Sequence, residues 1–311
     1  LKFYLIPHKG RNHITVSIKF IIYCLMVYKV LKPDRILLYL NKHAISAGLM
    51  FRFFRETPVF VIADSLKLLK GKKAVFYKRV YRYILSRSKT VFFVYKDDFD
   101  MIDVCRLDCK EQALLLKSRG VDMNRFTKFS LPKTDLVFMS MPVLCCHGTR
   151  CFIETARLVR EKYPKVRFLL SGKFSEDSSV LSYRELDEAC ENGTIYYIDE
   201  VDDIRPYLEV CSIYMQPNVS VREGHIIEAE AAGRPILASD HPVNRGLLIE
   251  GYNGFILPVN ETRKWADKII LLLENKELKA NMADYSHELC GRWHDKRKII
   301  KTITENLEKS L

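Results

Sequence analysis

Short apolar runs alternate with longer helical segments along almost the whole chain, and this alternation limits the possible folds more than any other feature. Strand–helix repeats of this length predict parallel sheets with helices on both faces. A chain of 311 residues is too long for one small core and fits two domains. We therefore predict an α/β protein with two doubly wound domains. The strand-like runs are residues 2–6, 35–40, 59–62, 90–95, 136–141, 166–171, 195–198, 213–215, 236–238 and 254–257.

The alternation breaks between residues 115 and 132, where polarity is mixed and no period is clear. We place the boundary there and predict domains at residues 1–128 and 129–294. The spacing of the apolar residues in 295–311 predicts an amphipathic helix, which we expect to cross back onto the first domain. Because the chain begins at Leu1, directly in a strand-like run, the first strand–helix unit of the N-terminal domain is expected to lie upstream.

Charge is distributed unevenly between the two halves. Residues 1–128 hold 26 Lys and Arg against 10 Asp and Glu, a net charge of +16, whereas residues 129–311 hold 24 against 28, a net charge of −4. A basic half favours a polyanionic partner, such as an anionic membrane surface, a phosphorylated acceptor or nucleic acid, although a solvated basic face is the alternative. The tyrosines among the cations of residues 77–83 fit base stacking or an amphipathic helix at an interface.

Cysteine usage and hydropathy indicate a cytoplasmic protein without a metal site. The nine cysteines are scattered and include no C-x-x-C pair, so reduced thiols are expected and a zinc site is not. The most apolar window, residues 20–28, lies between Lys19 and Lys29 and is far shorter than the roughly 20 residues that a spanning helix needs. No secretory signal is found.

Residues 216–240 form a strand–loop–helix–strand pattern with polar groups at the start of the helix. The loop carries Glu223 and Gly224, the helix opens near Ile226 and bears Glu228, and Gly233 is suited to a left-handed cap. Backbone N–H groups at such a start favour phosphate, and a nearby carboxylate can accept hydrogen bonds from ribose or sugar hydroxyls. The loop predicts a nucleotide-sugar site, although a glycine loop before a helix is common in α/β proteins.

Several motifs occur in the order found in family 4 glycosyltransferases, and the chain resembles that family, which has the GT-B fold of two domains facing a cleft. The resemblance covers nearly the whole chain and is most specific between about residues 118 and 300. The motifs are Gly120-Val121-Asp122 with Phe126, the helix and strand at residues 152–172, residues 200–208, Ser220 to Gly224, Glu228-Ala229 to Pro235, and Gly251 to Phe255.

The resemblance implies a set of donor-binding residues. Glu228 would bind the ribose hydroxyls and Glu223 would contact the transferred sugar. At the start of the helix, Gly224, His225 and Ile226 would offer backbone N–H groups to the sugar or diphosphate. The remaining donor-binding residues would be Asp199, Glu200 and Val201 around the base, with Gly172 and Lys173 at the end of another strand.

Three departures from the family pattern concern catalysis. Glu223 and Glu228 stand five residues apart rather than eight, and the first strand–helix unit is expected upstream of Leu1. Pro142 and His147 also occupy the positions of an Arg and a Lys that hold the diphosphate. Loss of two cations at a developing anion costs several kcal/mol of transition-state stabilisation. Protonated His147, Arg150 and Lys173 are the candidates to replace them, with a solvated surface role as the alternative for each. His147 and Glu223 are the predicted catalytic residues.

The resemblance implies a retaining glycosyltransferase that moves a sugar from a nucleotide-sugar, expected to be a UDP-sugar, to a lipid-linked or polysaccharide acceptor. Such an enzyme would need no cofactor or metal and would lie on the inner face of the cell membrane, bound through the basic domain. The alternative is a GT-B protein that binds a nucleotide-sugar without efficient transfer. Nucleic-acid binding depends on charge alone, no recognition motif supports it, and no nucleic-acid partner is expected.

Overall fold

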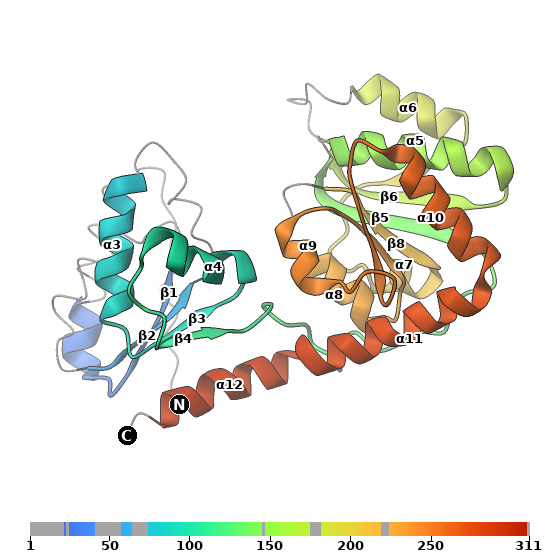
Figure 1. Cartoon of the computed structure of the whole chain (residues 1–311). Coiled ribbons are helices and arrows are strands. Elements are labelled where there is room, and N and C mark those ends of the chain that lie inside the picture. Colours follow the sequence, from blue (N-terminus) through green and yellow to red (C-terminus); the bar gives the residue numbers. More distant parts are fainter. Residues whose placement is uncertain are drawn as a thin grey trace. The chain divides into compact units, whose positions relative to one another are not determined.

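A computed structural model describes residues 22, 25–40, 57–63, 74–144, 147–174, 182–218 and 224–309, with no side-chain description at 142–144, 147, 174 and 224 (Figure 1). The chain divides into two compact units, Leu1–Lys117 with Ile300–Leu311 and Ser118–Ile299. The first unit thus ends eleven residues before the predicted boundary at 128. The strand-like run 2–6, the first part of the apolar segment 14–30 and the helical segment 44–55 lie outside the described residues.

The first unit contains a four-stranded parallel sheet in the order β1-β2-β3-β4. β3 is fully buried, as expected for a strand covered on both faces of a parallel sheet. The short strand β4 ends at Leu115, where the stretch that we assigned to the linker begins. The strands are β1 (Ile36–Leu40), β2 (Val59–Ala63), β3 (Thr90–Phe93) and β4 (Ala113–Leu115), the helices are α3 (Ala74–Ser86) and α4 (Lys96–Cys105), and residues 25–31 are helical.

The second unit contains a six-stranded parallel sheet in the order β10-β9-β8-β5-β6-β7. Its elements follow the predicted alternation (Figure 1). They are β5 (Leu136–Leu144), α5 (His147–Lys162), β6 (Arg167–Phe174), α6 (Tyr183–Glu191), β7 (Tyr196–Ile198), α7 (Arg205–Val210), β8 (Ile213–Gln216), α8 (Gly224–Ala231), β9 (Ile236–Ser239), α9 (Pro242–Leu247), β10 (Gly254–Leu257), α10 (Thr262–Glu274) and α11 (Lys276–Trp293).

Helices cover both faces of this sheet, because alternate side chains of its strands point to opposite sides. Ile213 and Met215 of β8 join a core with residues of α5, α6 and α10. Tyr214, between them, joins a second core with residues of α7, α8 and α9. The predicted doubly wound α/β fold is therefore confirmed for the second unit.

The two segments through which the chain passes between the units pair with each other inside the second unit. The amide of Val121 donates to the carbonyl of His294 at 2.8 Å, and that of Lys296 donates to the carbonyl of Val121 at 2.9 Å. Gly120 has a φ of +81°, and a Cβ there would lie 2.9 Å from the Cα of Lys296. This pairing places residues 118–128 in the second unit. The last helix, α12 (Lys296–Glu308), runs from the second unit into the first.

Candidate active site

The strand order of the second unit identifies its ligand-binding edge. From β5 the chain adds β6 and β7 on one side, and it then adds β8, β9 and β10 on the other. The reversal lies between β5 and β8, and ligands of open α/β sheets bind beyond the carboxyl ends of the strands at such a switch point. α5 and α8 both begin at this edge, since α5 follows β5 and α8 follows β8.

A bulge in β5 frees a backbone carbonyl at the switch point. The register with β6 shifts between Ser140 and Val143, where Pro142 has no N–H to donate, and proline in sheets is confined to such positions. The carbonyl oxygen of Ser140 lies 3.1 Å from Nδ1 of His225, and the Tyr214 hydroxyl donates to it at 3.3 Å. The end of β5 is thereby tied to β8 and to the first turn of α8.

The His225 imidazole is neutral near pH 7, because burial lowers its pKa, although the Ser140 carbonyl and the charge of Glu200 oppose that shift. A carbonyl only accepts hydrogen bonds, so we assign the proton to Nδ1, which leaves Nε2 as an acceptor. The sequence predicted a role only for the backbone of His225. The side chain also fixes the start of α8.

Glu228 lies one turn into α8 and is only partly exposed. Burial raises the pKa of its carboxyl to about 7; Arg125 opposes the rise and Asp203 adds to it. Asp203 stays ionised, because hydrogen bonds from Arg205 hold its pKa at about 2. In the described part of the chain, no hydrogen bond to the Glu228 carboxylate is recorded. A desolvated carboxylate of this kind is a strong acceptor for a ligand that brings its own donors.

The predicted base-lining residues lie at the ends of β6 and β7. The Ser171 hydroxyl donates to the carbonyl of Asp199 at 3.1 Å, and the Asp199 carboxylate accepts from the amide of Glu200 at 2.7 Å. Val201 packs against the core that contains α8. The carbonyl of Gly172 accepts from the Tyr197 hydroxyl at 2.8 Å. These groups share the carboxyl edge with Glu228.

The remaining predicted site residues have fewer described contacts. Lys173 is exposed in β6, and Gly224 and Ile226 lie in the first turn of α8, where Ile226 is buried. Glu223 and the side chain of His147 lie outside the described residues. Arg150 is ion-paired with Glu185 at 2.7 Å, so its charge is directed to α6.

Three residues near Glu228 were missed by sequence reasoning: Arg125, Asp203 and Tyr214. Arg125 stands in the motif between Asp122 and Phe126, within the stretch assigned to the domain boundary, and that position was the available signal. Tyr214 lay inside a predicted strand, where alternation alone does not show which end of the sheet its hydroxyl reaches.

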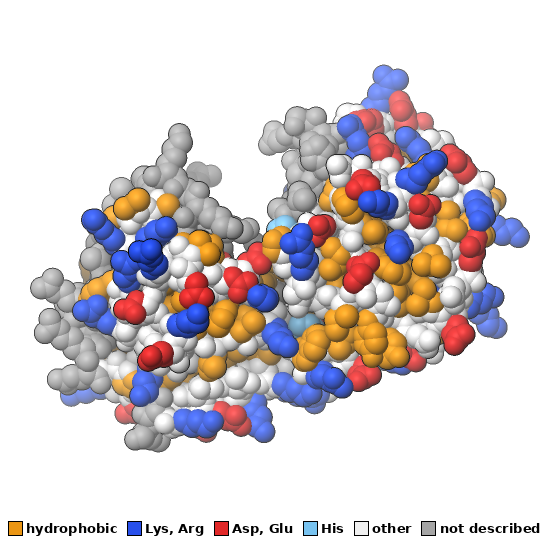
Figure 2. Space-filling model, viewed as in Figure 1, with side chains coloured by type: hydrophobic (Ala, Val, Ile, Leu, Met, Phe, Trp, Pro, Cys, Tyr) orange, Lys and Arg blue, Asp and Glu red, His pale blue; other side chains and the backbone are white. Residues whose placement is uncertain are grey.

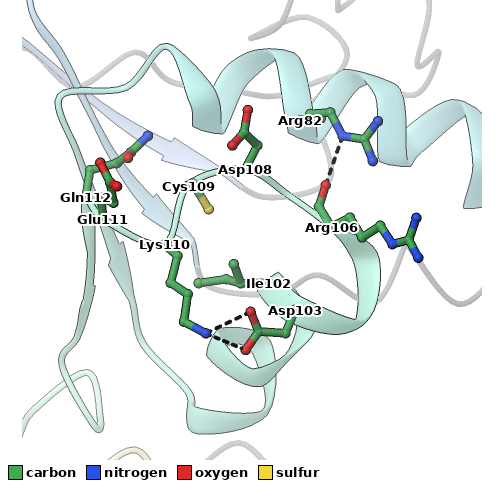
Figure 3. Close-up of a pocket in the computed structure, with 9 residues that line it drawn as sticks. All are labelled: Arg82, Ile102, Asp103, Arg106, Asp108, Cys109, Lys110, Glu111 and Gln112. Atoms are coloured by element: carbon green, nitrogen blue, oxygen red, sulfur yellow. Dashed lines mark hydrogen bonds and ion pairs between the residues drawn. The ribbon is translucent and has the colours of Figure 1, made fainter.

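A surface pocket of about 970 Å³ lies in the first unit, between α3, α4 and the loop before β4 (Figure 3). The Arg82 Nε donates to the carbonyl of Arg106 at 2.9 Å, and Lys110 pairs with Asp103 at 2.9 Å. α3 and α4 end here and β4 begins here, so the pocket is at the amino ends of the strands. Ligand crevices of parallel sheets lie at the opposite edge, and we assign this pocket to neither donor nor acceptor.

Among the described residues, no group of three or more His, Cys, Asp or Glu side chains is arranged to hold a metal ion. At the start of α4, Tyr95 is the N-cap residue and lacks a side-chain cap bond. Asp97 and Asp98 lie in the first turn of this helix. There they interact favourably with the helix dipole.

The chain is similar to known glycosyltransferases both in its family-model match and in its individual relatives. Residues 134–275 match the family model described as glycosyl transferases group 1. The chain is 26% identical over 219 residues to an N,N'-diacetylbacillosaminyl-diphospho-undecaprenol alpha-1,3-N-acetylgalactosaminyltransferase of Campylobacter jejuni, covering 65% of this chain and 56% of that protein. It is 29% identical over 150 residues to a phosphatidyl-myo-inositol mannosyltransferase of Mycobacterium leprae, covering 47% and 39%. The chain thus spans about half the length, or less, of these relatives.

Solved structures show the same fold. Anabaena HepE in complex with UDP superposes with a TM-score of 0.78 at 16% identity, covering 95% of this chain and 82% of that one. Sucrose-phosphate synthase of Thermosynechococcus elongatus gives 0.71 at 16% identity, covering 95% and 78%. The match at residues 134–275, the similar glycosyltransferases and the shared fold support the resemblance seen in the sequence motifs, that of a family 4 (group 1) glycosyltransferase with the GT-B fold.

Proposed function

We propose that the chain transfers a sugar from a UDP-sugar to a lipid-linked or polysaccharide acceptor, with retention of anomeric configuration. The observation that carries the proposal is the partly buried, hydrogen-bond-accepting carboxylate of Glu228 beside the start of α8, at the switch point of the sheet. A UDP donor is supported by the bound UDP of the HepE structure. A lipid-linked acceptor is supported by the diphospho-undecaprenol substrate in the name of the Campylobacter relative.

The proposed site works mainly by electrostatic stabilisation. Glu228 accepts hydrogen bonds from the ribose hydroxyls, and the first amides of α8, with the helix dipole, face the diphosphate. The bond between the anomeric carbon and the diphosphate oxygen breaks while the acceptor oxygen attacks from the same face. The acceptor proton passes to the departing diphosphate, giving the glycoside and UDP. Fixed donors that match the developing charge are usually the largest contribution to such catalysis, and we propose that no resident metal is required.

A panel of nucleotide-sugars with undecaprenyl-diphosphate-linked and polysaccharide acceptors tests this function. We expect one UDP-sugar to raise the melting temperature and to release UDP when the matching acceptor is added. Binding without release to any acceptor would support the impaired protein instead. A protein that binds neither UDP nor any UDP-sugar would overturn the proposal.

Donor affinity should depend on pH through Glu228. With a pKa of about 7, the ionised fraction falls about tenfold between pH 8 and pH 6. Because only the ionised form accepts two hydroxyl hydrogen bonds, we expect the Kd for UDP to rise by a similar factor, measured by calorimetry. The Glu228→Gln variant should bind weakly with a flatter profile. A wild-type Kd that is constant from pH 6 to pH 8 would contradict the assigned role.

We propose that the first unit binds an anionic membrane surface on the cytoplasmic side. On α3, Val75 is 71% and Phe76 is 52% exposed, and Arg79 and Arg82 are exposed farther along the helix. Figure 2 shows Lys and Arg side chains gathered over this helix, with hydrophobic side chains near its upper end. Apolar and cationic side chains on one exposed helix face suit an anionic interface. None of the described helices is both long and apolar enough to cross a bilayer.

Co-sedimentation with vesicles containing phosphatidylglycerol tests this surface. We expect Phe76→Asp to lower vesicle binding by about tenfold, because it removes an exposed aromatic side chain that would enter the interface and adds a charge that the anionic lipids repel. Val104→Asp is a matched control, since Val104 is 73% exposed on α4 in the same unit. Equal losses in both variants would mean that the α3 face is not the contact surface.

A further inference from the structure

A fully buried acid–imidazole pair joins α8 to both segments at the boundary between the units. Glu230 lies two residues after Glu228, and its side chain and that of His294 are both 0% exposed. The Glu230 Oε2 is 3.8 Å from the His294 Nε2, and the Glu230 Oε1 accepts from the Asn253 amide at 2.8 Å. A carboxyl group with no access to water is costly to retain unless it is paired, and the fold supplies partners from two other elements.

His294 contacts both boundary segments, which we define as residues 118–121 and 294–299. Its Nδ1 lies 2.9 Å from the hydroxyl of Ser118, which is itself buried. Its carbonyl accepts from the amide of Val121, and the adjacent Asp295 pairs with Val121 in a parallel bridge. The imidazole therefore stands between α8 on one side and the paired boundary segments on the other.

We propose that Glu230 and His294 are positioning residues that hold α8 in register with the boundary segments during sugar transfer. This inference rests on the proposed function. Donor binding uses groups of the second unit alone, whereas transfer also requires the acceptor, a phosphorylated form of which is an expected partner of the basic first unit. The boundary segments are the two places where the chain passes between these units. A link from α8 to these segments acts on the transfer step and leaves donor binding almost unchanged.

Two measurements on the full chain test the proposal, with UDP and the UDP-sugar selected by the panel as probes. We expect Glu230→Gln and His294→Gln each to lower kcat by about tenfold, while KM for the UDP-sugar and the Kd for UDP change by less than about threefold. The double variant should be no worse than either single one, because both remove the same link.

Hydrogen exchange gives a readout that does not depend on turnover. In the wild type, UDP should slow exchange at the amides of Val121 and Lys296, which close the pairing of the boundary segments. In the two variants, UDP should still protect α8 and should no longer protect these amides. Asp135→Asn is the control, since Asp135 pairs with the buried Lys279 of α11 at 2.6 Å elsewhere in the same unit; it should lower the melting temperature only.

The outcomes separate this inference from the proposed function. Variants that lose only thermal stability, with wild-type kcat, would overturn the inference, as would a Kd for UDP that weakens in step with kcat. If the variants do not fold, wild-type exchange decides: UDP protection at Val121 and Lys296 supports the link, and unchanged exchange there refutes it. Failure of the wild type to bind UDP or any UDP-sugar would instead refute the proposed function.

Discussion

Replacing Glu228 with alanine should weaken UDP binding by about 100-fold or more, measured by calorimetry at pH 8. The carboxylate is expected to accept two hydroxyl hydrogen bonds, and a hydrogen bond to a charged group contributes about 1.5–3 kcal/mol. The loss should appear in both Kd and KM, because the ribose is bound in the ground state and in the transition state alike. Glu161→Ala is the matched control, because Glu161 is exposed near the end of α5, whereas the ligand edge lies where α5 begins.

Although substitution of Glu228 should weaken UDP binding, Glu228→Gln should raise the stability of the unliganded protein. The folded-state pKa of about 7 lies above the ordinary 4.5, so the stability linked to this group is present below pH 4.5 and is lost as pH rises through 7. Removal of the charge in Glu228→Gln should therefore stabilise the unliganded protein at pH 8, on the order of 1–2 kcal/mol after allowance for partial exposure. Weaker UDP binding together with a lower melting temperature at pH 8 would instead indicate a damaged fold.

Local pattern was enough to predict most of the fold. The apolar runs at residues 136–141, 213–215 and 236–238 are central strands of a parallel sheet, and such strands appear as continuous apolar segments because both faces are buried. Gly233 has a φ of +68° after α8, as its predicted cap position requires. The family resemblance, drawn from several ordered motifs together, is supported by the match of residues 134–275 to the model of glycosyl transferases group 1.

The unit boundary and parts of the site depend on contacts that a linear pattern does not contain. Residues 118–121 appeared to belong to a linker, but they pair with residues 294–296 almost 180 positions later. Glu230 and His294 each looked like an ordinary polar residue until the fold brought them within 3.8 Å. The raised pKa of Glu228 likewise arises from burial, which one carboxylate in a sequence does not show.

Replacing Arg234 with methionine should lower the melting temperature of the second unit by about 6–12 °C. The Arg234 guanidinium is fully buried and donates to three carbonyls, those of Cys211 at 2.9 Å, Phe129 at 2.7 Å and Ser130 at 3.1 Å. Methionine fills similar volume but leaves these acceptors without donors, at a cost of about 1–3 kcal/mol each. Burial of the guanidinium also has a cost, since desolvation lowers the Arg234 pKa. Removing that charge offsets part of the loss, and we expect the free energy of unfolding to fall by about 3 kcal/mol.

The effect should be specific to the buried guanidinium. Arg245→Met is the control, because Arg245 forms an exposed ion pair with Asp240, and such pairs contribute about 0–1 kcal/mol. Equal melting temperatures for the two variants would show that the three carbonyls find other donors. Because Arg234 ties the end of α8 to residues 129–130, a large selective loss would instead show that the helix bearing Glu228 is held at both ends, by His225 at its start and by Arg234 just past its end.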